Sequence, residues 1–267
     1  MNILLTNDDG IDSPGLLAQY GALRRFGDVS VVAPDRNQSG VGRAISIGAD
    51  LCADERELPD GEIGYAISGT PVDCVRMAHL GLVPGPIDAV VAGINLGQNL
   101  GEDVTYSGTV GAALEGVLLG LPAVGVSQRI GGLWHPDMTG ATDFAPVARF
   151  TAGLLDDLLA VGFPEGLALN INAPQTAPGH PSGARLTHLT RCVYRDQLEQ
   201  VAVDERGRHY RIYGRAPLYV GGEGTDSDTI TGGEISVTPI GLNLDPPTEA
   251  LPPRLAAAVD ARAPEAA

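Results

Sequence analysis

The feature that most constrains this chain is a regular alternation, from residue 2 to residue 171, of short apolar runs with segments of helical spacing. The run at 2–6 is followed by Ser13 and Pro14, a pair typical of a helix start, and then by a second apolar run. This alternation predicts parallel strands joined by helices. The expected strands are 2–6, 28–33, 65–67, 87–94, 122–127 and 167–171, and the expected helices are 14–27, 71–80, 109–119 and 144–159.

Beyond about residue 185 the alternation ends. Four tyrosines stand there among polar and arginine-rich stretches, which favour hairpins or an arm over further strand–helix units: Tyr194, Tyr210, Tyr213 and Tyr219. The end of the chain is rich in Pro and Ala and predicts a frayed tail, or a short helix near 255–259. We therefore expect an α/β protein with its core at 1–184, a β-rich extension at 185–245 that completes the domain, and a tail at 246–267.

All 17 basic residues are arginine, and they face 33 acidic residues, which gives a formal net charge of −16. Without lysine the chain cannot form a Schiff base, and it lacks the lysine of a Walker-type phosphate loop. The acidic excess disfavours polyanionic partners, because binding them needs basic surface. We therefore expect neither nucleic-acid polymers nor anionic membranes among the partners of this protein.

The sequence also indicates a cytoplasmic protein. No basic segment precedes the first apolar run, as it would in a signal peptide, and no run approaches the roughly 18 apolar residues of a membrane-spanning helix. The cysteines are odd in number and lack CxxC spacing, so we expect buried free thiols and no zinc ribbon or disulfide scaffold. They are Cys52, Cys74 and Cys192.

Polar residues directly follow four of the expected strands. They occupy 7–10 after the first strand, 35–40 after the second, 68–71 after the third and 95–99 after the fourth. In an open parallel sheet, ligands bind beyond the carboxyl ends of the strands. We therefore expect carboxylates, hydroxyls, amides and glycines to converge on one site.

Asp8 and Asp9 form the centre of this predicted site. Two carboxylates held close together repel each other by about 4 kcal/mol at the effective dielectric of a protein surface. Either one of them keeps a proton or a cation lies between them, and without lysine that cation is an arginine or a metal ion. Asp-Asp-Gly is also common in solvated turns, but its position opposite other oxygen donors favours a metal site.

Oxygen donors of these kinds suit Mg²⁺, Mn²⁺ or Ca²⁺. The histidines show no HxxxH or HExxH spacing, and we interpret them as surface or packing residues, with His135 as a candidate exception because it lies in a loop beyond an expected strand. The five are His79, His135, His180, His188 and His209.

A second candidate element is the segment at 106–113. Small and hydroxyl residues at a helix start expose backbone N–H groups and the positive end of the helix dipole, which together bind phosphate. Helix capping by Ser107 or Thr109 explains the same pattern without a ligand. A phosphate-binding helix start beside an oxygen-rich metal site is the arrangement that phosphoryl transfer needs.

Three other motifs are incomplete or absent. The segment at 40–45 begins like a dinucleotide-binding fingerprint, but Ile45 stands at the third glycine position. The GxSxG sequence of serine hydrolases does not occur. Haloacid-dehalogenase phosphatases carry DxD after the first strand, whereas this chain has two adjacent aspartates.

Seven segments of the chain, taken in order, resemble the motifs of the SurE family, the survival-protein nucleotidases. The matching segments are 2–10, 34–40, 68–75, 93–101, 106–110, 224–226 and 236–239. The resemblance implies a Rossmann-like core, a metal-dependent 5′-nucleotidase activity on nucleoside monophosphates, and a C-terminal arm exchanged between subunits in homodimers or homotetramers. It also implies one Mg²⁺ or Mn²⁺ per subunit, with metal ligands that carry over onto Asp8, Asp9, Ser39 and Asn95.

Asp8 and Asp9 are therefore the expected catalytic residues. The expected contacts to the substrate and its phosphate are Asn7, Gly40, Ser107, Gly108 and Thr109. The sequence leaves two routes open. In one, a water attacks phosphorus in line, with Asp8 or Asp9 as proton acceptor. In the other, Asp8 acts as a covalent nucleophile.

The chain departs from the family pattern at Glu234, where an aromatic residue is frequent, and at 227–229, which replace a more apolar run. These departures concern the pocket wall expected near Asp226, and with it the substrate preference. Two other functions stay open: a non-catalytic nucleotide- or metal-binding module, and a glycosyltransferase-like protein that holds a metal and a nucleotide sugar. The second would release no phosphate from a plain monophosphate.

Overall fold

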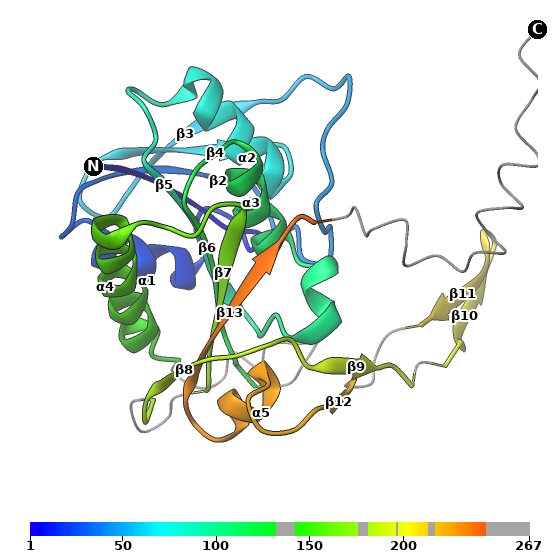
Figure 1. Ribbon diagram of the computed structural model, residues 1–267. Helices are drawn as coiled ribbons and strands as arrows, with labels where there is room; N and C mark the ends of the chain where they lie inside the picture. Colours follow the sequence, from blue (N-terminus) through cyan, green and yellow to red (C-terminus); the bar gives the residue numbers. More distant parts are fainter. Residues whose placement is uncertain (132–141, 176–180, 196, 213–216, 244–267) are drawn as a thin grey trace, which may run out of the picture.

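The computed structural model describes the chain apart from residues 132–141, 176–180, 196, 213–216 and 244–267, and Figure 1 shows how its elements are arranged. The strands are β1 (Asn2–Thr6), β2 (Asp28–Pro34), β3 (Ala53–Glu57), β4 (Ile63–Ile67), β5 (Ala89–Leu96), β6 (Ala123–Gln128), β7 (Leu167–Ala173), β8 (Ala184–Leu186), β9 (Arg191–Val193), β10 (Glu199–Asp204), β11 (Gly207–Arg211), β12 (Leu218–Val220) and β13 (Ile235–Gly241). The helices are α1 (Pro14–Leu23), α2 (Pro71–Met77), α3 (Gly108–Leu118), α4 (Ala145–Val161) and α5 (Asp226–Thr231), with short helical turns η1 (Ala78–Leu82) and η2 (Gly101–Thr105). The predicted tail lies outside the described residues.

Nine strands form one sheet in the order β3-β4-β2-β1-β5-β6-β7-β13-β8. Every neighbouring pair from β4 to β7 is parallel, which confirms the α/β core predicted from the alternation. At one edge β3 pairs antiparallel with β4, and at the other β13 pairs antiparallel with β7. The strand expected at 167–171 is the last strand of the alternating pattern but not the edge of the sheet, because β13 returns from the C-terminal region to pair with β7, and β8 then pairs with β13.

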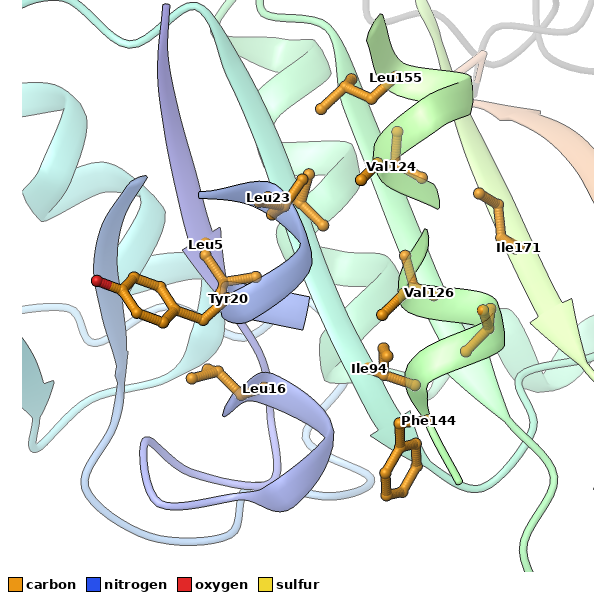
Figure 2. Packing of buried hydrophobic residues seen from close by; sticks show 14 of the residues in the cluster. Leu5, Leu16, Tyr20, Leu23, Ile94, Val124, Val126, Phe144, Leu155 and Ile171 are labelled. Carbon is orange, nitrogen blue, oxygen red and sulfur yellow. The ribbon is translucent and has the colours of Figure 1, made fainter. Parts of the chain in front are cut away.

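The alternation of side chains along each strand divides the apolar residues between two cores. Ile3 and Leu5 of β1 pack on the side of α1 and α4, whereas Leu4 packs on the side of α2 and α3. Figure 2 shows the first core, in which Leu16 of α1 and Leu155 of α4 contribute to the same cluster. Each large side chain buried in this way stabilises the fold by about 1.5–3 kcal/mol. Helices on both faces thus hold the sheet rigidly and leave its ends free to carry loops.

Capping residues set the starts of the helices. Pro14 occupies the first turn of α1. The Thr70 hydroxyl accepts a hydrogen bond from the Asp73 N–H at 3.2 Å, and the Ser107 hydroxyl accepts one from the Val110 N–H at 3.1 Å. Ser107 is therefore the residue that caps α3.

Two helices end before their predicted ends. The α-helix expected at 71–80 is regular only to Met77, and η1 continues the helical backbone until Gly81, whose φ of 110° a helix does not accommodate. The helix expected to reach Gly27 ends at Leu23.

The C-terminal region forms the β-rich extension that the sequence predicted. β9 pairs with β12, and β10 pairs with β11 in a hairpin that stands away from the sheet (Figure 1). Every residue of β10 and β11 is exposed. In contrast, β13 joins the main sheet and α5 packs beside it. The region therefore supplies both a projecting arm and a strand of the core.

The described part of the chain holds no helix with the length and apolar character needed to cross a bilayer. Its three cysteines are free, as expected, but only Cys74 is buried. Cys52 is exposed because it stands just before the edge strand β3, and Cys192 of β9 is partly exposed.

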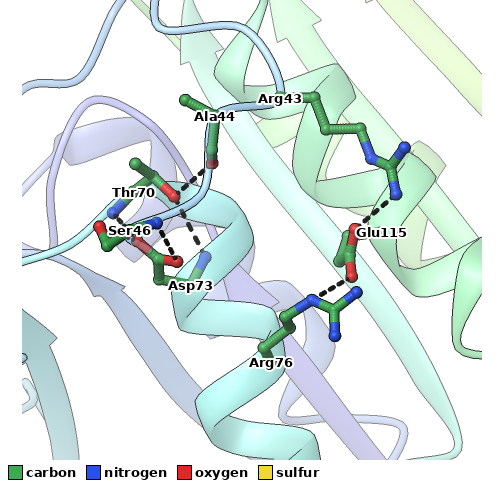
Figure 3. Close-up of polar contacts among 7 residues, drawn as sticks. All are labelled: Arg43, Ala44, Ser46, Thr70, Asp73, Arg76 and Glu115. Atoms are coloured by element: carbon green, nitrogen blue, oxygen red, sulfur yellow. Dashed lines mark hydrogen bonds and ion pairs between the residues drawn. The ribbon is translucent and has the colours of Figure 1, made fainter. Parts of the chain in front are cut away.

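A buried carboxylate ties the long β2–β3 connection to two helices. Glu115 of α3 is only 1 % exposed, and it pairs with Arg43 of the connection and with Arg76 of α2, each at 2.6 Å (Figure 3). Both arginines are partly exposed, so the carboxylate is the buried member of the group. One acidic group thus holds two helices and a loop together.

The same connection is fixed by the capping residues of α2. The Ser46 hydroxyl donates to Asp73 at 2.7 Å, and the Thr70 hydroxyl donates to the Ala44 carbonyl at 2.8 Å (Figure 3). Burial acts to raise the pKa of Asp73, but hydrogen bonds from Thr70 and Ser46 outweigh it, and the pKa lies below its ordinary value. These contacts fix the connection that also carries Ser39, a predicted metal ligand.

We expect replacement of Glu115 by Gln to lower the free energy of unfolding by about 3 kcal/mol, because two arginines lose the buried carboxylate that they share. Urea unfolding followed by circular dichroism measures this change. Glu62→Gln is the matched control, since Glu62 forms an exposed pair with Arg24 at 3.6 Å and its loss should change stability by less than about 1 kcal/mol. Equal losses in the two variants would contradict the structural role of Glu115.

Candidate functional site

The carboxyl ends of β1, β2 and β5 and the start of α3 surround a cavity of about 340 Å³. The lining comes from the loop after β1 (Asp8 and Asp9), the loop after β2 (Asn37, Ser39 and Gly40), the end of β5 and the segment that follows it (Asn95, Leu96, Gly97, Gln98, Asn99, Asp103 and Tyr106), and the cap of α3 (Ser107). Three of the four strand ends that the sequence singled out therefore meet around one cavity, whereas the residues at 68–71, after β4, do not line it.

Most of the predicted site residues line this cavity: Asp8, Asp9, Ser39, Gly40, Asn95 and Ser107. Asn7, Gly108 and Thr109 do not. Asn7 is fully buried, and its amide donates to the Gly10 carbonyl at 2.9 Å and accepts from the Gly10 N–H at 3.2 Å. Its side chain therefore closes the turn that presents the two aspartates.

Asp8 is held by the first residues of α3. The Thr109 hydroxyl donates to Asp8 Oδ1, and a Cβ on Gly108 would lie 2.8 Å from the Asp8 Cβ, so only glycine fits there. Burial raises the pKa of Asp8, and the hydrogen bonds from Thr109 and from the backbone of Gly108 act against that rise. The start of α3 was predicted to hold a phosphate. Two of its residues, Gly108 and Thr109, instead contact the carboxylate of Asp8, and Ser107 faces the cavity.

Asp9 is less deeply buried than Asp8, and its Oδ2 accepts a hydrogen bond from the Leu96 N–H at 2.9 Å. Burial and, second, the charge of Asp8 raise the pKa of Asp9 to about 7. Among the described residues, no arginine lines the cavity. The two carboxylates therefore need either a shared proton or a cation from solution.

The donors around the pair fit a hard divalent cation. The amide nitrogen of Asn95 donates to the Gly97 carbonyl at 2.9 Å, which leaves Oδ1 as its acceptor atom. Ser39 lies in the loop whose Gln38 N–H donates to the Asp8 carbonyl at 2.7 Å. Within the described ranges no three His, Cys, Asp or Glu side chains gather to hold an ion, so an ion here would depend on two carboxylates completed by hydroxyl and amide oxygens.

Buried amides of β7 anchor one wall of the cavity. The Asn99 N–H donates to Asn172 Oδ1 at 2.8 Å, and the Asn99 carbonyl accepts from the amides of Asn170 and Asn172 at 2.8 and 2.9 Å. The Asn99 side chain donates to the Ser127 hydroxyl of β6 at 2.8 Å. The segment after β5 is therefore tied to the two neighbouring strands.

Residues 3–196 match the family model described as survival protein SurE. The chain belongs to the SurE family. A relative from Rubrobacter xylanophilus, named 5′-nucleotidase SurE, is 51% identical over 247 residues, which are 91% of this chain and 92% of the relative. A relative of the same name from Chloroflexus aggregans is 44% identical over 245 residues, which are 91% and 94% of the two chains.

A solved structure agrees with this assignment. The crystal structure of the SurE protein from Aquifex aeolicus superimposes with a TM-score of 0.74 at 35% sequence identity, and the match covers 92% of this chain and 95% of that one. The resemblance inferred from the motifs of the sequence is thereby confirmed.

Asp226, in the late motif that resembles the SurE family, supports the site without lining it. It is fully buried, and its two carboxylate oxygens accept from the N–H groups of Gly101 and Thr190, both at 2.9 Å. A Cβ on Gly101 would collide with the Thr190 carbonyl. Asp226 therefore does not form the pocket wall that was expected near it, and acts on the site through Gly101. Glu234, the other departure from the family pattern, does not line the cavity and pairs with Arg185 at 2.5 Å.

One cavity residue, between the predicted segments 95–99 and 106–113, was missed from the sequence: Asp103. Asp103 accepts hydrogen bonds from the hydroxyls of Tyr194 and Tyr219, the latter at 3.3 Å. Burial raises the pKa of Asp103 to about 6. Tyr106 is 59% exposed and offers a ring at the cavity. An acidic residue after a buried strand was the available signal, but its tyrosine partners lie 91 and 116 residues away in the sequence.

The histidines do not contribute to this cavity in the described part of the chain. His79, His188 and His209 do not line it, and His209 is 2.9 Å from Asp204. His135 and His180 lie outside the described residues.

The raised pKa of Asp9 predicts how the stability of the metal-free protein depends on pH. Between about pH 4, its ordinary pKa, and about pH 7 the folded state binds a proton that the unfolded chain has lost, so stability falls as the pH rises. The loss reaches up to about 4 kcal/mol and levels off above pH 7. Urea unfolding in EDTA from pH 4.5 to pH 8.5 measures it.

In Asp9→Asn this loss should be strongly reduced, so the variant becomes more stable than the natural chain at pH 8 in EDTA. If the free energy of unfolding changed with pH in the same way in both proteins, Asp9 would not be the source of the loss.

Proposed function

We propose that this chain is a divalent-metal-dependent phosphomonoesterase that hydrolyses nucleoside monophosphates, a 5′-nucleotidase that uses one Mg²⁺ or Mn²⁺ per subunit. The relatives that carry this name align with more than nine-tenths of the chain. The observation that carries the proposal is the buried pair of Asp8 and Asp9, without a basic partner in the cavity and beside the oxygen donors of Ser39 and Asn95. Three free thiols accord with the cytoplasm, to which we assign the protein.

Asp8, Asp9, Ser39 and Asn95 would hold the ion. When bound, a divalent ion neutralises charge on the phosphate and lowers the pKa of a neighbouring water. The hard donor set favours Mg²⁺ or Mn²⁺ over ions that prefer sulfur. In a chain of net charge −16, added positive charge at this point also allows an anionic substrate to approach.

The packing around Asp8 favours attack by water over a covalent aspartyl intermediate. Asp8 Oδ1 already accepts the Thr109 hydroxyl, and Gly108 packs against its Cβ, so this carboxylate is fixed in place. We assign Asp9, which is more exposed, as the acceptor of the proton that water loses as its oxygen bonds to phosphorus and the nucleoside oxygen leaves. The Ser107 hydroxyl accepts from the backbone of α3 and keeps its own proton for a phosphate oxygen.

A binding module without catalysis and a glycosyltransferase-like protein are the alternatives. Both would use the same oxygen donors, but neither releases phosphate from a nucleoside monophosphate. Membership of the SurE family, together with relatives named as nucleotidases, favours hydrolysis.

We expect metal-stripped protein to release no phosphate from a panel of nucleoside monophosphates, and Mg²⁺ or Mn²⁺ to restore release. Asp9→Asn should lower the metal-dependent rate at least a hundredfold, because it removes a charged ligand and the proton acceptor. Asp12→Asn is the matched control, since Asp12 is exposed in the same loop and does not line the cavity. A folded protein that releases no phosphate with any ion would favour the binding module, and an active Asp9→Asn would refute the metal site.

We further propose that the arm within 185–245 joins this chain to other copies in a homodimer or homotetramer. An isolated two-stranded hairpin is only marginally stable in water, and all residues of β10 and β11 are exposed. Apolar side chains stand on this hairpin, among them Val201, Val203 and Tyr210, which are 45%, 65% and 46% exposed. A second copy of the chain would cover them.

Light scattering coupled to gel filtration should give a mass of at least two chains for the natural protein. Val203→Asp should weaken this assembly at least tenfold, because a charge would then be buried at the interface. Gln200→Asp, on the same strand, adds the same charge at a polar position and should change assembly less. A natural protein that is monomeric at micromolar concentration would refute the proposal.

A further inference from the structure

A second cavity, of about 300 Å³, adjoins the first. Gly97 and Gln98 line both cavities, so the two share one stretch of wall. On the far side of this wall the second cavity is lined by Arg129 and Tyr219, among others. A ligand that extends from the first cavity past Gln98 therefore meets an arginine.

The sheet places Arg129 close to the predicted metal ligands. Asn95 of β5 pairs with Ser127 of β6, and Arg129 follows two residues later, where its N–H still bonds to the Ala173 carbonyl at 2.9 Å. With about 3.3 Å per residue along a strand and about 4.8 Å between strands, its Cα lies about 8 Å from that of Asn95. The arginine thus stands at the same carboxyl edge of the sheet as the first cavity.

The guanidinium of Arg129 has no carboxylate partner among the described residues. Its Nε donates to Gln98 Oε1 at 2.5 Å, and no ion pair or further side-chain hydrogen bond involves it in the described ranges. Burial lowers the pKa of Arg129 from its ordinary value, which shows that its charge is partly removed from water. A partly buried cation that meets no anion in the described part of the chain is unusual in a protein with 33 acidic and 17 basic residues.

The orientation of this guanidinium is fixed from one side. Gln98 accepts from Arg129 through its oxygen and donates through its nitrogen to the Tyr219 hydroxyl at 3.1 Å, and Tyr219 in turn donates to Asp103 at 3.3 Å. Because Nε is engaged, the two terminal nitrogens keep their fork of donors for a ligand. Such a fork matches the paired oxygens of a phosphate group.

We propose that Arg129 forms a second anion subsite, which binds another phosphate of a nucleotide whose reacting phosphate lies at Asp8 and Asp9. This inference rests on the proposed nucleotidase function and names a substrate class for it: nucleotides with two phosphates. The second phosphate is either on the sugar, as in a nucleoside 3′,5′-bisphosphate, or in line with the first, as in a nucleoside diphosphate. Both present the same oxygens to the arginine.

The test compares kcat/KM for adenosine 3′,5′-bisphosphate and for adenosine 5′-diphosphate, each divided by kcat/KM for adenosine 5′-monophosphate. In Arg129→Gln at least one of these ratios should fall tenfold or more, mainly through KM, because a charge-assisted contact to the second phosphate is lost. Arg129→Lys keeps the charge and should retain part of the ratio. Arg149→Gln, which removes an exposed arginine of α4, should leave both ratios unchanged.

The ratio that falls shows where the second phosphate bound by the subsite is attached, on the sugar or in line with the first phosphate. Ratios that stay equal in the natural chain and in Arg129→Gln would overturn the proposal, even if all rates fell together, because that result means that Arg129 only positions Gln98.

Equilibrium dialysis of the same three nucleotides with the same variants separates this inference from the proposed function. If no nucleotide is hydrolysed, weaker binding of a two-phosphate nucleotide to Arg129→Gln than to Arg149→Gln still supports the subsite. Equal binding by both variants overturns it, whether or not the natural chain proves to be a phosphatase.

Discussion

The repulsion between two neighbouring buried carboxylates is the constraint around which this structure is organised. Asp8 and Asp9 follow the central strand β1, and the fold surrounds them with hydrogen-bond donors and no basic side chain in the described part of the cavity. Such a pair is unfavourable without a bound cation, and in the metal site proposed here the relief of this repulsion would contribute to the binding free energy of a divalent cation. The site is thus built to be completed by what it binds.

Support for this pair comes from distant parts of the chain. Asn172 of β7 fixes the segment after β5 through Asn99, and Asp226 of α5 fixes the same segment through Gly101. Neither contact reaches a cavity-lining side chain of the first loop, yet both determine the shape of the wall that faces it. β7 and α5 therefore belong to the architecture of the site as much as the first loop does.

The elements with strong local signals could be predicted from the sequence, and those created by pairing could not. β1 is an apolar run, so its position and the acidic turn after it were evident. β3 has the sequence Ala-Asp-Glu-Arg-Glu and becomes a strand only because it pairs with β4. β13 was not predicted as a strand because it contains Pro239, a residue that strands accept mainly at sheet edges. β8 pairs only with residues 235–237, so the side of β13 that faces β8 is an edge at Pro239. The tyrosines around Asp103 and the clamp at Asp226 depend on tertiary contacts that no local pattern reveals.

The clamp between Asp226 and Gly101 also determines when during synthesis the site becomes complete. Ribosomes add about 5–20 residues per second, so Asp226 follows Asp8 by roughly 10–40 seconds. During that interval the nascent chain already carries its acidic turn, but the open edge of β7 still lacks β13 and the N–H of Gly101 still lacks its acceptor. A chain released early would keep the aspartates but lack the contact from Asp226 that fixes the wall opposite them.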